Sequence, residues 1–160
     1  MTTYTTTTTK PKVRLLWKNV NMYHVCQHFV LPLTKAEGCS YVELVASELQ
    51  PPQWLVSHAW STAFAATANM LTQHGRARSN NGSFSGPSEL SPLLPTTPQQ
   101  AVLLPDPIVY WICTLANNQH DLSGLHEADL LKTPFGRVLL SPSTHGTVLL
   151  CDQAVTPLRR

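Results

Sequence analysis

The chain has 160 residues, of which 42% are hydrophobic and 12% are charged, and its formal net charge is +2. This length suits one globular domain with a buried core. The few Lys and Arg are scattered instead of clustered, which argues against a nucleic-acid-binding surface. No basic and apolar leader opens the sequence, and no apolar run reaches the roughly 20 residues of a membrane span. We therefore expect a cytoplasmic protein without a membrane or nucleic-acid partner.

The first half of the sequence begins with a polar stretch and then a helical pattern. Seven of residues 1–11 are Thr, and we expect a disordered tail ahead of a single domain over 12–160. Asn21 can cap a short amphipathic helix, which Pro32 is expected to end. The apolar residues of this helix at helical spacing are Met22, Val25, Cys26 and Phe29.

A second helix is indicated by Ser40 and Glu43, whose spacing is that of a capping box, and Pro51 is expected to stop it. Its apolar face would carry Val42, Val45 and Leu49. A short buried strand over 54–57 follows. Ser61 can then cap a third helix, which we expect to stop at Gly75 because glycine readily takes the left-handed conformation at a helix end.

Residues 76–107 are rich in Ser, Asn, Gly and Pro without periodicity, and we expect a disordered, dispensable insertion. The β-branched and aromatic run over 108–114 is the strongest strand signal in the chain. Thr133 followed by Pro134 predicts the start of a short helix. A third buried strand is expected over 147–151. Strands that alternate with helices predict an α/β fold with a small parallel sheet of about three strands in the order 2-1-3.

Four sequence blocks, taken in order and with their spacing, resemble a TIR-like domain family of dinoflagellate and other algal proteins. The blocks are Cys39–Leu44, Trp54–Trp60, Tyr110–Cys113 with Ala116–His120, and Gly146–Leu150 with Ala154–Leu158. This resemblance implies a flavodoxin-like or TIR-like fold with NAD or a related nucleotide as the ligand. In that family the segment at Thr156–Arg159 continues into a helix with a catalytic Glu. The resemblance therefore implies that the domain is incomplete here and that this chain is not an enzyme.

The candidate ligand site lies where the predicted strands end, because ligands of open parallel sheets bind beyond the carboxyl ends of the strands. Amide, imidazole and indole groups at these ends could contact sugar hydroxyls, a phosphate and a base. The candidate residues are Ser57, His58, Trp60, Asn117, Asn118, Gln119, His120 and Asp152. Ordinary turn and packing chemistry also explains these residue types, and that interpretation stays open.

Two other sites are weaker hypotheses. A triad of Ser57, a histidine and Asp152 lacks the strained Gly-x-Ser-x-Gly turn. A zinc site of His58, His120 and Cys113 is disfavoured because Cys113 is expected to point into the sheet core.

Three functional hypotheses follow from the sequence. The first is a TIR-like interaction or signalling module that binds protein partners and a nucleotide without turnover. The second is an NAD-cleaving hydrolase whose catalytic Glu lies beyond this chain. The third is a degenerate fragment that folds poorly, because its third strand would form an unprotected apolar edge.

Overall fold

The computed structural model describes residues 16–79 and 107–152, and its sheet has three strands. Strand β1 (Trp54–His58) lies between β2 (Tyr110–Trp111) and β3 (Gly146–Leu150), and both pairings are parallel. The predicted α/β class and the strand order 2-1-3 are therefore confirmed. The expected tail over 1–11 and residues 80–106 of the expected insertion lie outside the described residues. The helical elements are η1 (Trp17–Asn19), α1 (Met22–Val25), η2 (Cys26–Val30), α2 (Leu31–Thr34), α3 (Tyr41–Val45), α4 (Phe64–Ser79), α6 (Cys113–Ala116), η3 (Ser123–His126), η4 (Leu130–Lys132) and α7 (Pro134–Leu139).

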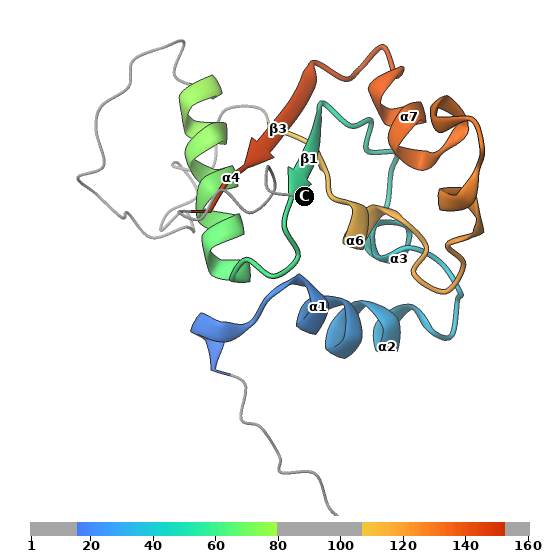
Figure 1. Cartoon of the computed structure of the whole chain (residues 1–160), viewed down its shortest axis with the longest axis horizontal. Helices are drawn as coiled ribbons and strands as arrows, with labels where there is room; N and C mark the ends of the chain where they lie inside the picture. Colours follow the sequence, from blue (N-terminus) through green and yellow to red (C-terminus); the bar gives the residue numbers. More distant parts are fainter. Residues whose placement is uncertain (1–15, 80–106, 153–160) are drawn as a thin grey trace, which may run out of the picture.

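Helices lie on both sides of the β1–β3 pair: α4 on one side, and α3, α6 and α7 on the other (Figure 1). Neighbouring side chains of a strand point to opposite faces of the sheet. Leu55 and Val56 are both buried, so β1 is covered on each face at these positions. The strand is buried on both faces there, as predicted. Towards its end the coverage is incomplete, because Ser57 of β1 and its register partner Leu149 of β3 are both exposed on one face.

The first helix begins as predicted but continues past Pro32. The side chain of Asn21 accepts a hydrogen bond from the backbone N–H of His24, which caps α1. Pro32 lies in the first turn of α2, after the π-helical segment η2. The wide π-turn also keeps residues four apart on one face of the helix. Val30 is therefore buried, whereas Phe29, which was expected to be buried, is exposed. The buried residues of this helical run are Met22, Cys26, Val30 and Thr34.

Helix α3 has the predicted capping box but is shorter than expected. Ser40 accepts a hydrogen bond from the Glu43 backbone, and the Glu43 carboxylate accepts one from the Ser40 N–H at 2.7 Å. The helix ends at Val45, because Ala46 is already extended. Leu49 was expected on the buried face and is 95% exposed. Helical spacing of apolar residues therefore did not suffice to extend the helix to Pro51.

Helix α4 runs through Gly75 to Ser79, so the predicted stop at Gly75 is wrong, as is the placement of residues 76–79 in the insertion. Gly75 faces β2, and a Cβ there would lie 3.6 Å from the Tyr110 hydroxyl oxygen, which is an ordinary van der Waals contact. The packing of α4 on the sheet thus extends the helix beyond its glycine. None of the helices in the described ranges has the length and apolar character needed to cross a membrane.

Strand β2 is shorter than the predicted strand over 108–114, and Cys113 begins helix α6 instead. The predicted start of α7 is confirmed, since Thr133 Oγ1 accepts a hydrogen bond from the Gly136 N–H and Pro134 opens the helix. Val138 of α7 is buried, while its neighbour Leu139 is exposed. The third strand is confirmed as β3, shifted by one residue from the predicted 147–151.

Candidate functional site

The carboxyl ends of β1 and β3 lie side by side, with His58 opposite Leu150. Ser57 is exposed, and no hydrogen bond connects it to a histidine among the described residues. Both ring nitrogens of His58 are buried without a hydrogen-bond partner in the described part of the chain. This burial lowers the pKa of His58 from its ordinary value, so the neutral ring is favoured. A neutral imidazole does not supply the positive charge expected to bind a phosphate.

Trp60 is half-buried and contacts two helices. Its Nε1–H donates a hydrogen bond to Cys113 Sγ at 3.4 Å. Its ring meets the Tyr23 ring edge-on, with 5.2 Å between the centroids. Trp60 therefore joins the loop after β1 to α1 and α6, and its contacts are those of a packing residue.

The candidate residues after α6 make hydrogen bonds within the chain. Asn117 is buried, and its N–H caps α6 by donating to the carbonyl oxygen of Cys113 at 3.0 Å. Asn118 donates to the carbonyl oxygen of Gly38, and its Oδ1 accepts from the His120 N–H at 2.9 Å. The amide groups of this turn thus fix the turn itself and join it to the loop before α3.

Gln119 and His120 connect the same turn to the first helical run. Gln119 donates to the Cys113 carbonyl oxygen at 3.0 Å, and its Oε1 accepts from the Cys26 thiol at 3.7 Å. His120 Nε2 lies 2.9 Å from the hydroxyl of buried Thr34. The structure therefore brings Asn117 to His120 together with the helices of residues 22–34. No hydrogen bond among the described residues joins them to Ser57 or His58. Asp152 is half-buried after β3 and makes contacts of its own.

The two weaker sites find no geometric support in the described ranges. No group of three metal-ligating His, Cys, Asp or Glu side chains exists there. The expectation that Cys113 points into the sheet core is wrong, because Cys113 opens a helix and its sulfur accepts the Trp60 hydrogen bond. Burial and the neighbouring Cys113 raise the pKa of the Cys26 thiol, which disfavours the reactive thiolate.

A cluster of aromatic and basic side chains at the other end of the sheet was not predicted. His74 Nδ1 lies 2.7 Å from the Tyr110 hydroxyl oxygen, and this hydroxyl donates to the Leu71 carbonyl oxygen at 3.3 Å. The guanidinium of Arg78 lies 4.7 Å from the centre of the Trp54 ring. Burial and Arg78 lower the pKa of His74. The cluster fastens the last turns of α4 to β1 and β2.

The register between β1 and β2 was the signal that could have revealed this cluster. Trp54 and Tyr110 are register partners in a parallel pair, so their side chains share one face. A helix that covers this face places His74 against them, and its continuation beyond Gly75 adds Arg78. The sequence interpretation ended the helix at Gly75 and so left out the contact of Arg78 with Trp54.

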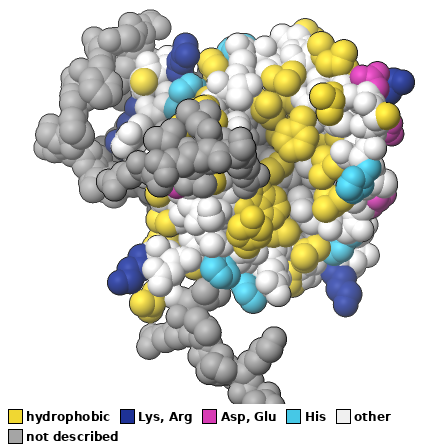
Figure 2. Space-filling model, in the orientation of Figure 1, with side chains coloured by type: hydrophobic (Ala, Val, Ile, Leu, Met, Phe, Trp, Pro, Cys, Tyr) yellow, Lys and Arg dark blue, Asp and Glu magenta, His cyan; other side chains and the backbone are white. Residues whose placement is uncertain are grey.

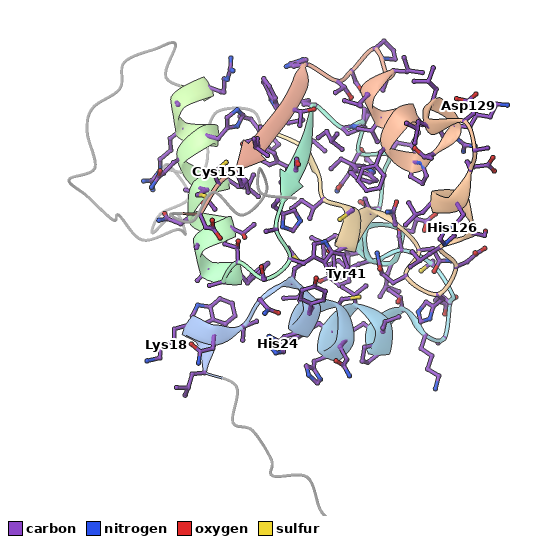
Figure 3. The ribbon with its side chains drawn as sticks, viewed as in Figure 1. Lys18, His24, Tyr41, His126, Asp129 and Cys151 are labelled. Atoms are coloured by element: carbon purple, nitrogen blue, oxygen red, sulfur yellow. The ribbon has the colours of Figure 1, made fainter. Side chains whose placement is uncertain are left out.

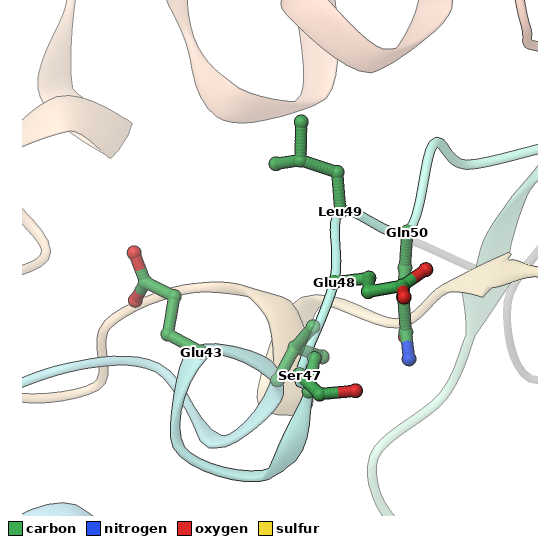
Figure 4. A pocket seen from close by; sticks show the side chains of 7 residues that line it. Glu43, Ser47, Glu48, Leu49 and Gln50 are labelled. Atoms are coloured by element: carbon green, nitrogen blue, oxygen red, sulfur yellow. The ribbon is translucent and has the colours of Figure 1, made fainter.

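One open depression of about 400 Å³ adjoins the end of α3 (Figure 4). Its labelled side chains do not converge: Leu49 projects away from the chain, while Glu43 and Gln50 point in different directions. The Glu43 carboxylate is occupied in the Ser40 capping box, and these hydrogen bonds lower its pKa. The depression therefore offers no set of groups aimed at one ligand atom.

A group of exposed apolar side chains lies on η4 and α7 in the described part of the chain. Leu130, Leu131, Leu139 and Leu140 are each more than half exposed, and Phe135 is 38% exposed. We call these five residues the η4–α7 surface. Figure 2 shows apolar side chains gathered on the half of the molecule that carries α3, α6 and α7, with Lys and Arg at its margins.

Comparison of the chain with protein-family models, with curated proteins and with solved structures finds no match. The assignment of a function therefore depends on the geometry of the described residues.

Proposed function

We propose that the chain is a TIR-like protein-interaction module that binds a protein partner through the η4–α7 surface. The observation that carries the proposal is the exposure of five large apolar side chains on one short helical unit. Soluble monomers rarely expose apolar groups together in this way, and such patches mark interaction surfaces. The parallel sheet with order 2-1-3 supports the TIR-like part of the proposal.

The rim of this surface is polar, as is usual for protein interfaces. Asp129 and Lys132 form an exposed ion pair with 3.8 Å between the charged atoms. Arg137 is exposed on α7 between Phe135 and Leu139 in sequence. Figure 3 shows Asp129 at the outer margin of this side of the molecule, opposite Lys18 at the far margin. An apolar centre with charges around it can bury leucines while the charges stay hydrated.

The η4–α7 surface is held in a fixed shape from beneath. Phe135 packs edge-on against Trp111 of β2, with 4.9 Å between the ring centroids. Gly136 lies so close to the backbone of η4 that no side chain fits between them. The Thr133 hydroxyl joins the two elements, since it donates to the Leu130 carbonyl oxygen at 2.6 Å and accepts from Gly136. A preorganised surface loses less entropy when it binds.

A pair of charge substitutions tests the proposal. Tagged wild-type chain and a Leu131→Glu/Leu139→Glu variant are used to enrich partners from the source cells, with exposed Leu33→Glu on α2 as the matched control. We expect the double variant to lose proteins that wild type and the control retain. Because both leucines are exposed, stability should change by no more than about 0.5 kcal/mol per site. Identical enriched proteins, or an unfolded double variant, would contradict the proposal.

A further inference from the structure

The two outer edges of the sheet differ. Strand β2 is only two residues long, and Pro107 precedes it. A short edge strand and a nearby proline both commonly protect a sheet edge from pairing with another strand. Strand β3 has five residues and forms the opposite edge. The stretch from His145 to Cys151 contains no Asp, Glu, Lys, Arg or Pro. The β3 edge therefore lacks the charges and prolines by which proteins prevent pairing with another strand.

Among the described residues, no strand pairs with the outer edge of β3. In a parallel pair, alternate peptide groups of a strand point toward the neighbour and the others point away from it. Because β1 is the single neighbour of β3 among the described strands, half of the β3 peptide groups face outward. On the sheet face opposite α4, Thr147 and Leu149 are exposed. Parallel strands are normally covered on both faces, so this corner of the sheet has the character of an interface.

We propose that two copies of the chain pair antiparallel through their β3 edges, about a two-fold axis, so that two three-stranded sheets become one of six strands. A second copy fits because the edge is uncharged, so two β3 strands can pair without charge repulsion. In this symmetric interface the outward N–H and C=O groups of each β3 form hydrogen bonds with those of the other copy. The register that pairs all five residues places Val148 opposite its own copy. Thr147 then lies opposite Leu149 of the second copy, and the exposed leucine is covered.

This inference does not depend on the η4–α7 surface. It predicts a dimer of wild-type chain in sedimentation equilibrium, with the mass falling to that of one chain in a Thr147→Lys/Leu149→Lys variant, where like charges crowd the axis. Leu33→Lys on α2 is the matched control and should stay dimeric. The Leu131→Glu/Leu139→Glu variant should also stay dimeric, which separates this proposal from the proposed function. A wild-type chain that is a monomer at the highest attainable concentration overturns the inference.

Cysteine cross-linking tests the register even if the lysine variant does not fold. In a Cys151→Ser background, Thr147→Cys and Leu149→Cys together bring two thiols across the axis. Directly opposed residues in antiparallel strands have Cα atoms about 4.5–5.5 Å apart, within the range of a disulfide. Diamide should convert the double-cysteine chain to a covalent dimer and leave each single-cysteine chain monomeric on a non-reducing gel. A covalent dimer of the Leu149→Cys chain alone, or none from the double variant, overturns the register.

Discussion

Gly136 in α7 gives the sharpest stability prediction. A Cβ at this position would overlap the Leu130 carbonyl oxygen and lie 2.5 Å from Leu131 Cα and 2.7 Å from Leu131 C. These are backbone atoms, so η4 as a whole would have to move. Overpacking of this kind costs about 1–3 kcal/mol, and occasionally more. Displacing η4 would also weaken the Thr133 cap, worth about 1 kcal/mol. The higher helix propensity of Ala offsets at most about 1 kcal/mol of this loss of stability.

We therefore expect Gly136→Ala to lower the free energy of unfolding by about 2 kcal/mol, or roughly 4–8 °C in Tm for a chain of this size. Gly75→Ala is the matched substitution in the interior of α4, where a Cβ meets only ordinary contacts. It should stabilise by about 0.5–1 kcal/mol. Urea unfolding followed by circular dichroism measures both. If Gly136→Ala is as stable as wild type, α7 does not pack on η4 as described, and the η4–α7 surface has another shape.

Three further predictions concern a helix cap, a buried histidine and catalysis. Ser40→Ala should cost about 1 kcal/mol in urea unfolding, because it removes the α3 cap; an unchanged midpoint would show that the capping box contributes nothing. Burial lowers the pKa of His58 in the folded chain from its ordinary value of about 6.5. Below that pH the unfolded chain binds a proton that the folded chain does not bind, so the free energy of unfolding decreases as the pH is lowered. His58→Phe should flatten this fall between pH 7 and 5 in thermal unfolding, whereas exposed His126→Phe should keep the wild-type slope; equal slopes in both variants would refute the assignment. Finally, the chain should release no nicotinamide from NAD, because this cleavage needs a carboxylate fixed beside the ribose, whereas Asp121 is exposed in a turn where it accepts a hydrogen bond from the Ser123 N–H; chromatographic detection of release that is lost in Asp152→Asn would show that Asp152 is catalytic.

The sheet could be predicted because its signals are local. Trp54–Val56 and Thr147–Leu150 are apolar runs bounded by turn residues, and alternation with helices implies parallel order. Capping residues likewise identified the starts of α1, α3 and α7, since a cap acts within four residues.

Helix ends were predicted less well because tertiary packing decides them. Pro32 and Gly75 are stop signals that η2 and the contacts of α4 with Tyr110 override. Leu49 follows helical spacing, yet it lies beyond the end of α3 and is exposed. The candidate ligand site was predicted from polar residues that follow strands, and a ligand there stays a prediction. The short α6 helix carries Asn117–His120 onto the helices of residues 22–34.

Site-specific photo-cross-linking from residue 139 tests the proposed interaction most directly. A photoreactive amino acid replaces Leu139 of the η4–α7 surface, and the same replacement at exposed Leu33 on α2 serves as the reference. Illumination in cells of the source should yield a discrete cross-linked protein from position 139 that is absent from position 33 and is lost when Leu131→Glu is added. Equal cross-linking from both positions, or none from position 139, would contradict the account.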